Sequence, residues 1–220
     1  MVTKTILYYT ASREEKSFEE KNREILLRNS GGLPIVSVSQ KPIDFGKNIC
    51  VGDVGNSYIN EFRQIYIGLQ QIKTEYFIST EADFLYPEDY FSFEPTGENI
   101  YRSDNLWLLY SSGIFHKKER SEGAQIAKTE FMREFLKGYL SRLPEWFDGR
   151  PSKNDECYSS FIRSQNKLWK LPFTFFTSSP CITFKTKHGV NIFAGVEKDQ
   201  SVEELPYWGH ITNIRKLYAN

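Results

Sequence analysis

Apolar and polar positions alternate along the first eighty residues in a way that predicts strands separated by helices. Short runs rich in β-branched and aromatic residues have the composition and length of strands at 4–10, 33–39 and 74–80. The polar run 17–32 lies between the first two and predicts a helix. Because a crossover of this length favours a parallel pair of strands, the pattern predicts a parallel sheet with this helix on one face.

The ends of the first helix are predicted from local signals. Ser17 and Glu20 have the spacing of a capping box, and Gly31 and Gly32 are typical of a helix stop. The next segment, 40–57, contains a proline and three glycines, and we expect it to be a loop.

The strongest helical signal follows at 57–73. Its apolar residues recur at intervals of four, three, four and three, which gives one apolar stripe made of Tyr58, Phe62, Ile65, Leu69 and Ile72. Such a stripe predicts an amphipathic helix packed on the sheet.

The second half of the chain is less regular. We expect one or two strands in 99–115, a helix in 123–143, a shorter helix in 154–166 and further strand material in 173–189. Strands that alternate with helices, followed by this mixed half, predict an α/β sandwich around a mostly parallel central sheet.

Composition narrows the function classes. The 220 residues include 28 basic and 28 acidic side chains, so the chain is not a generally basic nucleic-acid binder. Three cysteines lie far apart without metal-ligand spacing, so we expect reduced thiols and a cytoplasmic protein. The N-terminal apolar run is too short for a signal peptide, and no stretch approaches the roughly 18 apolar residues of a membrane span, so we expect no transmembrane segment.

The sequence FISTEADFLY places two carboxylates at the end of the third predicted strand. Glu81 and Asp83 are two residues apart, so in an extended chain both side chains point the same way. Ligands of open parallel sheets bind outside the carboxyl ends of the strands, and carboxylate oxygens are the ligands that Mg²⁺ and Mn²⁺ prefer. The pattern therefore predicts a divalent cation, Mn²⁺ or Mg²⁺, at this edge.

Three segments together resemble the GT-A family of nucleotide-sugar glycosyltransferases. They are ILYYTASR near the N-terminus, the helix NEFRQIYIGLQQIKTEYF and the acidic stretch ISTEADFLYP, which is similar to the Asp-x-Asp motif of that family. The resemblance covers residues 4 to about 90 and extends loosely over 140–191. It implies a GT-A (Rossmann-like) α/β/α sandwich in a single domain, 1–220, with a nucleotide-binding half, 1–98, and an acceptor-side half, 99–220.

The resemblance also implies a metal site and a donor site. The last acidic residue of the family motif makes the closest metal contact, which assigns the metal to Asp83. Glu81 stands where the first aspartate is usual, so a role in orienting the ribose or the donor sugar remains open. A histidine late in the chain completes the metal site in many members, which points to His188, with His210 as the substitute.

Residues of the donor site follow by the same resemblance. The loop after the first strand holds the nucleoside, which implies contacts from Thr10, Ala11, Ser12 and Arg13. A basic residue on the striped helix faces the diphosphate in many members, and Arg63 stands there; a plain surface arginine is the alternative.

Inverting members of the family place a general base late in the chain, where an acidic pair opens a helix. Asp155 and Glu156 match this placement, and Asp104 is a rival that could equally bind the donor sugar. The competing explanation is structural, since acidic residues in the first turn of a helix are favoured by the helix dipole.

The resulting hypothesis is a metal-dependent glycosyltransferase of the hexosyltransferase type. It would transfer a sugar from a nucleoside-diphosphate sugar, with UDP favoured by the resemblance, to an acceptor hydroxyl with inversion. If neither acid reaches the acceptor, a retaining route assisted by the leaving phosphate is the alternative. The acceptor remains open among a glycan, a lipid-linked sugar, a protein side chain and a hydroxymethylated base in DNA. A nucleotidyltransferase is the alternative enzyme, although the glycine-rich phosphate loop usual in that class is missing from YTASREEK; a carbohydrate- or nucleotide-binding module is the non-enzymatic alternative.

Overall fold

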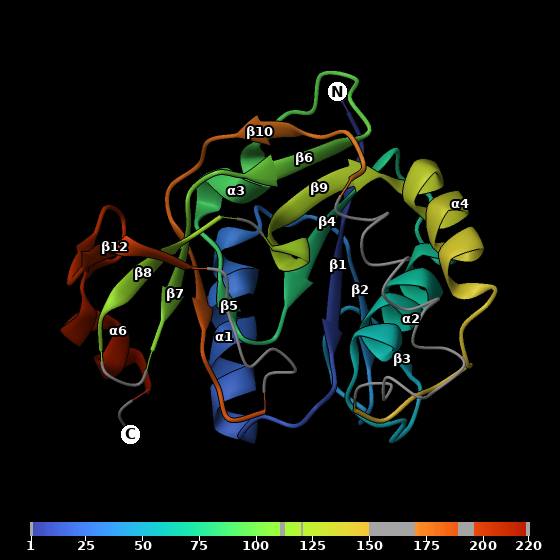
Figure 1. The fold of residues 1–220 in the computed structure, drawn as a ribbon, viewed down its shortest axis with the longest axis horizontal. Coiled ribbons are helices and arrows are strands. Elements are labelled where there is room, and N and C mark those ends of the chain that lie inside the picture. Colours follow the sequence, from blue (N-terminus) through green and yellow to red (C-terminus); the bar gives the residue numbers. More distant parts are fainter. Residues whose placement is uncertain (1, 111–112, 120, 150–169, 189–195, 219–220) are drawn as a thin grey trace.

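The computed structural model describes residues 2–110, 113–119, 121–149, 170–188 and 196–218 (Figure 1). Within these ranges the larger sheet has seven strands in the order β10-β6-β9-β4-β1-β2-β3. Strands β1 to β4 run parallel to one another, whereas β9 is antiparallel to both of its neighbours. The strands are β1 (Lys4–Thr10), β2 (Ile35–Ser39), β3 (Lys47–Cys50), β4 (Tyr76–Glu81), β6 (Ile100–Ser103), β9 (Gln125–Lys128) and β10 (Thr174–Phe176).

Helices cover both faces of this sheet. α2 (Tyr58–Leu69) and α4 (Thr129–Leu140) lie side by side on one face and share an apolar core with inward side chains of β1, β2 and β4 (Figure 1). α1 (Lys16–Asn29) covers the other face, where Leu26 joins the second core cluster. The predicted α/β/α sandwich around a mostly parallel sheet is therefore confirmed.

A smaller mixed sheet stands beside α1, in the order β12-β8-β7-β11-β5 (Figure 1). Its strands are β5 (Phe84–Leu85), β7 (Leu106–Leu109), β8 (Phe115–Lys118), β11 (Cys181–Phe184) and β12 (Val196–Val202). The hairpin β13 (Glu204–Leu205) and β14 (Gly209–His210) leads into α6 (Ile211–Tyr218). The short helices α3 (Glu88–Ser92) and η1 (Glu122–Ala124) connect the two sheets.

The regular elements of the first half follow the prediction. The strands at 4–10, 33–39 and 74–80 appear as β1, β2 and β4, and β1 pairs with β2 in parallel. In the striped helix Phe62, Ile65 and Leu69 are buried, as the period of the stripe requires.

Three expectations were wrong. Ser17 does not cap α1, because the helix begins one residue earlier and its N-cap, Glu15, makes no side-chain cap bond. The segment 40–57 is not all loop, since β3 pairs with β2. The predicted helix 123–143 begins only at Thr129, because 125–128 is recruited as β9 between β4 and β6. The helix expected at 154–166 lies outside the described residues.

The fold brings three strand ends to one edge of the sheet. Because β1, β2 and β4 are parallel and in register, Thr10 lies beside Ser39, and Tyr9 lies beside Glu81. The loops that follow these strands therefore share one side of the molecule. In the described part of the chain, none of the helices has the length and apolar character needed to cross a membrane.

Candidate functional site

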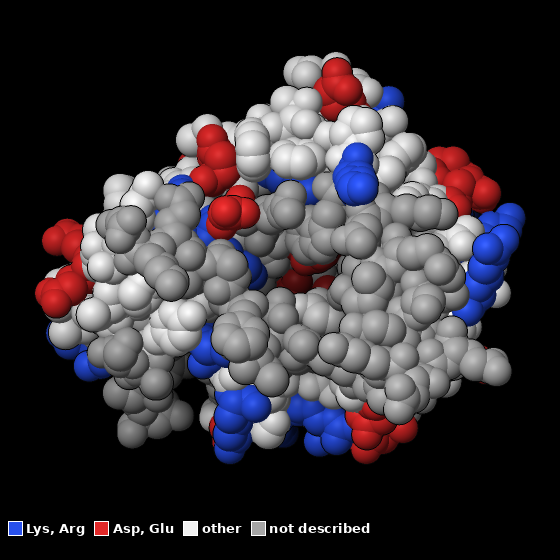
Figure 2. Space-filling view, in the orientation of Figure 1, with Lys and Arg blue, Asp and Glu red and all other residues white. Residues whose placement is uncertain are grey.

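A cavity of about 310 Å³ opens at this edge of the sheet. Its walls come from the loop after β1, the first turns of α2, the segment after β4, the end of β8 with η1, and the segment after β11. Figure 2 shows acidic side chains at the bottom of a hollow near the centre of the face it displays. The position matches the place where open α/β sheets bind ligands.

The structure brings six of the residues expected in the site to this cavity. The lining includes Thr10, Ala11, Arg13, Glu81, Asp83 and His188. They are contributed by three segments that are up to 178 positions apart in the sequence, as the distance from Thr10 to His188 shows. Their meeting depends on the sheet order and on the return of the chain through β11.

Three expected residues lie elsewhere among the described residues. Ser12 belongs to the loop after β1 but is buried, and the lining does not include it. Arg63 donates through Nη2 to the backbone oxygen of Pro144 at 2.8 Å, so it fastens the end of the α4 region to α2. The Oδ2 atom of Asp104 accepts a hydrogen bond from the Thr177 hydroxyl at 2.8 Å, away from the cavity lining.

The remaining candidates divide into two groups. Asp155 and Glu156, the expected general base, lie outside the described residues. His210, the substitute metal ligand, is not part of the described cavity lining; its Nε2 atom lies 3.6 Å from Oε2 of Glu203, the residue that precedes β13.

The loop after β1 is fixed by the start of α2. Gln64 is almost fully buried, and its Nε2 atom donates to the backbone oxygens of Thr10, at 2.9 Å, and Val38, at 3.2 Å. One side chain therefore ties the ends of β1 and β2 together. Beyond this point Arg13 forms an exposed ion pair with Asp53, which places a guanidinium at the rim of the cavity.

The acidic segment after β4 is held by hydrogen bonds on both sides. Tyr9 donates through its hydroxyl to Oε1 of Glu81 at 3.1 Å, and the Glu81 amide donates to the Tyr86 hydroxyl at 2.9 Å. The backbone oxygen of Asp83 accepts from the amide of Phe184 at 2.9 Å. Tyr9 thus holds the Glu81 carboxylate, while Tyr86 and the neighbouring strand β11 fix the backbone that presents both acids.

Sequence reasoning did not identify two further acids in the lining. Glu61 comes from the first turn of α2, and Glu122 comes from η1. The signal for Glu61 was present, since Glu61 and Gln64 are polar residues one turn apart beside the apolar stripe. No local signal marked Glu122, because its approach to Glu81 depends on the pairing of β9 with β4.

Burial and repulsion between carboxylates raise the pKa values of Glu61, Glu81 and Asp83. Desolvation, followed by the charge of Asp83, raises the pKa of Glu81 to about 8. Desolvation also raises the pKa of Asp83 to about 6, and it raises the pKa of Glu61 well above its ordinary value, with Glu81 as the next cause. Lys118, at the end of β8, lowers all three values. A cation bound among these groups would favour their ionised forms.

The donor set suits a hard divalent cation that also binds phosphate. Asp83 and His188 line the same cavity, with the Glu81, Glu61 and Glu122 carboxylates as further oxygen donors. In the described ranges, no three His, Cys, Asp or Glu side chains are grouped so as to hold a metal ion by themselves. Mg²⁺ is commonly held by one or two carboxylates, with the remaining positions taken by water and substrate phosphates, so the residues present fit such an ion.

The segment after β11, which carries His188, is connected to α2 through the loop that precedes this helix. Asn56 donates through Nδ2 to the backbone oxygen of His188 at 2.8 Å, and its own amide donates to Oδ1 of Asp148 at 2.9 Å. Asn60, one turn into α2, donates to the backbone oxygens of Val54 and Phe147, both at 2.7 Å. These contacts bring the segment after β11 and the segment after α4 to the same rim.

Comparisons with known proteins give matches among solved structures only. Neither a protein-family model nor a curated protein matches the chain. A glycosyltransferase involved in glycosylation of the major capsid of PBCV-1 is 12% identical, with a TM-score of 0.44, over 80% of this chain and 81% of that one. The apo form of the glycosyltransferase GlyE of Streptococcus pneumoniae is 12% identical, with a TM-score of 0.48, over 80% of this chain. This chain spans only 45% of the GlyE chain.

A nucleotidyltransferase is also among the matches. The inositol-1-phosphate CTP transferase of T. maritima is 13% identical, with a TM-score of 0.46, over 83% of this chain and 89% of that one. Both enzyme classes considered from the sequence therefore occur among the solved structures of similar shape. Similarity at this level does not assign an activity to the chain.

Proposed function

We propose that this protein is a metal-dependent glycosyltransferase of the hexosyltransferase type, which transfers a sugar from a nucleoside-diphosphate sugar to an acceptor hydroxyl. The observation that carries the proposal is the single cavity that joins the loop after β1 to the acidic segment after β4. A nucleoside diphosphate needs a surface for its base and a cation for its phosphates, and the two segments offer these at one edge of the sheet.

Each group of residues has a distinct part in this proposal. The loop formed by Thr10, Ala11, Ser12 and Arg13 would hold the nucleoside, with uridine favoured by the sequence resemblance. Its small residues let a ring approach the backbone closely, and the Arg13 guanidinium can meet a phosphate or a base oxygen. Glu81 would orient the ribose or the donor sugar from the floor of the cavity.

Asp83 and His188 would hold Mn²⁺ or Mg²⁺. When bound, the ion supplies charge stabilisation for the diphosphate leaving group, which is worth several kcal/mol. The residues of the chain orient the donor and keep its phosphates at the rim of the cavity. The carboxyl group of Asp155 or Glu156 would remove the proton of the acceptor hydroxyl and give inversion at the sugar carbon.

The direct test is hydrolysis of a panel of sugar nucleotides with and without Mn²⁺ or Mg²⁺. When the acceptor is missing, glycosyltransferases of this type slowly transfer the sugar to water and release the nucleoside diphosphate. We therefore expect one donor to be consumed, and only when the metal is present. Pyrophosphate release from a nucleoside triphosphate would instead support a nucleotidyltransferase. Metal-independent binding without turnover of any donor would support a binding module.

A further inference from the structure

The face of α1 that packs against the rest of the protein carries polar residues where an apolar stripe is expected. Glu19, Asn22 and Asn29 are 5%, 2% and 3% exposed. Their spacing of three and seven residues places them along one side of the helix. Burial of polar groups costs free energy unless they are hydrogen-bonded. The hydrogen-bond partners of these three side chains therefore indicate the role of this face of the helix.

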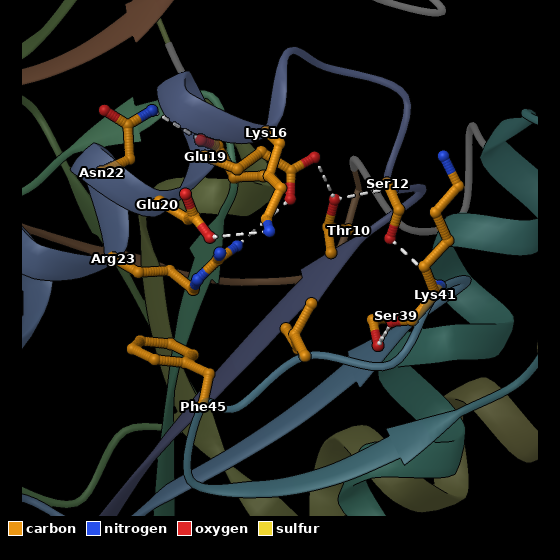
Figure 3. Close-up of polar contacts among 12 residues, drawn as sticks. Thr10, Ser12, Lys16, Glu19, Glu20, Asn22, Arg23, Ser39, Lys41 and Phe45 are labelled. Atoms are coloured by element: carbon orange, nitrogen blue, oxygen red, sulfur yellow. Dashed lines mark hydrogen bonds and ion pairs between the residues drawn. The ribbon is translucent and has the colours of Figure 1, made fainter.

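Glu19 holds the loop after β1. The Thr10 hydroxyl donates to Oε1 of Glu19 at 3.0 Å, and the same hydroxyl oxygen accepts from the Ser12 amide at 2.8 Å (Figure 3). The second oxygen of Glu19 receives a hydrogen bond from Nη1 of Arg23 at 3.3 Å, which keeps the carboxylate turned toward Thr10. Burial raises the pKa of Glu19 from its ordinary value, and the Thr10 and Arg23 contacts oppose this shift.

The loop held in this way has an unfavourable backbone conformation. Ser12 has a φ of 52°, in the left-handed region of the backbone that residues other than glycine rarely adopt. Its hydroxyl accepts from the Lys41 amide at 3.2 Å, which adds a second contact to this turn (Figure 3). A strained turn of this kind persists only when its surroundings fix it.

Two asparagines of the same helix hold the acidic segment. Asn22 donates through Nδ2 to the backbone oxygen of Ala82 at 2.6 Å, and Asn29 donates to that of Tyr86 at 2.7 Å. The first contact lies between Glu81 and Asp83, and the second follows β5. Two turns of one helix therefore fix both ends of the segment that carries Asp83.

We propose that α1 is a brace that sets the position of the base-binding loop relative to the metal-binding segment, with Glu19 and Asn22 as its positioning residues. The inference rests on the proposed function, because it assigns these two segments to the two ends of one nucleoside diphosphate. A ligand that contacts both segments binds well only when both are already in place, since otherwise part of its binding energy is spent on ordering them.

The test compares Glu19→Ala, Glu19→Gln and Asn22→Ala with Glu20→Ala, an exposed neighbour on the same helix, as the matched control. Hydrogen exchange of the ligand-free protein reports on the loops themselves. We expect faster exchange at residues 10–13 in Glu19→Ala and at residues 82–86 in Asn22→Ala, with Glu20→Ala unchanged. Glu19→Gln keeps an oxygen acceptor for Thr10, so it should restore most of the protection at 10–13.

Calorimetric titration of the same proteins with UDP and Mn²⁺ measures the consequence for binding. Glu19→Ala and Asn22→Ala should each weaken binding by about tenfold, the value of one hydrogen bond that involves a charged or buried group. Glu19→Gln and Glu20→Ala should bind within about twofold of the unmodified protein.

The outcomes separate this inference from the proposed function. If the unmodified protein binds no UDP with Mn²⁺, the proposed function is in doubt, and the exchange data alone decide whether α1 braces the two segments. Unchanged exchange at both segments would overturn the brace, as would faster exchange spread evenly over the chain. Local exchange changes with unaltered UDP affinity would overturn the role of the brace in binding.

Discussion

At the scale of single residues, Glu81 is an acid of the cavity with close contacts to its carboxylate and its amide. A Cβ atom built on Gly123 would lie 2.2 Å from Oε1 of Glu81, so the carboxylate rests directly against this glycine. The backbone oxygen of Gly123 in turn accepts from the Tyr86 hydroxyl at 2.6 Å, and that hydroxyl accepts from the Glu81 amide. Position 123 therefore has no space for a side chain while Glu81 keeps its orientation.

A methyl group at Gly123 should disturb the site without removing any polar group. We expect Gly123→Ala to weaken metal-dependent UDP binding by about tenfold, or about 1.4 kcal/mol, because Glu81 must turn away. Isothermal titration measures this effect. Gly138→Ala is the matched control: nothing lies within 4 Å of a Cβ there, and the change should leave binding intact and stabilise α4 by about 0.5–1 kcal/mol. Equal affinity in both variants would contradict the account of Glu81.

The raised pKa values of the acids predict how metal binding depends on pH. Asp83 has a pKa of about 6 and its neighbour Glu81 a pKa of about 8, so both must lose protons before the cavity has the negative charge that favours a cation on Asp83. The affinity for UDP and Mn²⁺ should therefore rise between pH 6 and pH 8, by up to about tenfold per pH unit for each proton released. In Glu81→Gln the upper part of this rise should disappear. An affinity that is flat across this range would refute the predicted proton release.

At the scale of elements, the close approach of α2 to the sheet depends on one glycine. A Cβ atom on Gly68 would lie 2.3 Å from Cδ1 of Leu7 and 3.1 Å from Cγ2 of Val38, and both of these side chains are fully buried. The same helix carries Glu61 and Gln64 to the cavity, so its distance from β1 and β2 matters for the site as well as for the core.

Enlarging this position should force the helix or Leu7 to move. We expect Gly68→Ala to lower the free energy of unfolding by about 1–3 kcal/mol, as is usual when a packed core is overfilled. Urea denaturation of the two glycine variants in α2 and α4 measures the contrast, since Gly138→Ala should act in the opposite direction. A stabilised Gly68→Ala protein would show that α2 is less tightly packed than described.

Elements with strong internal signals could be predicted from the sequence, and elements defined by their neighbours could not. β1 and α2 have runs and stripes that specify them locally. β3 is only four residues long and owes its structure to pairing with β2. Residues 125–128 continue into a helix without a break in the apolar pattern, so their pairing with β4 could not be read from the chain.

The same distinction applies to the site. The place of Glu81 and Asp83 beside the cavity was predictable because they stand at the end of a buried strand, and that of the loop at 10–13 because it begins at the end of another. Glu122 could not be predicted, since it reaches Glu81 only after the smaller sheet has returned the chain to β9. Glu19 was also missed, because a buried acid in a polar helix looks like an exposed one until its partner Thr10 is placed.

At the scale of the whole molecule, the formal charges balance, but acidic side chains are concentrated in the cavity. The chain has equal numbers of acidic and basic residues, yet Glu61, Glu81, Asp83 and Glu122 all line one cavity. The raised pKa values of Glu61, Glu81 and Asp83 mean that the folded protein resists ionising these three acids, whereas the unfolded chain ionises them at ordinary values. The candidate site thereby has some cost in stability.

This cost predicts a pH dependence of the metal-free protein. For an acid with a raised folded-state pKa, the stability contribution is fully present below the unfolded-state pKa and is lost as pH rises through the folded-state value. The acids of the cavity should therefore lower stability between about pH 4 and pH 8. We expect the double variant Asp83→Asn, Glu81→Gln to have a higher Tm than the unmodified protein at pH 8 in EDTA, and a similar Tm near pH 4. The reverse order at pH 8 would contradict the described electrostatics.

The most direct test of the central claim is a calorimetric titration of the protein with UDP, in Mn²⁺ and in EDTA, alongside Asp83→Asn. The account predicts that the unmodified protein binds UDP in Mn²⁺ only. Asp83→Asn should lose about a hundredfold or more in affinity. Mutation of a residue that only supports a metal ligand typically lowers metal affinity tenfold to hundredfold, and removal of the charged ligand itself should cost more. Binding that is equal in EDTA, or that survives in Asp83→Asn, would contradict the claim that this cavity holds a nucleoside diphosphate through a divalent cation.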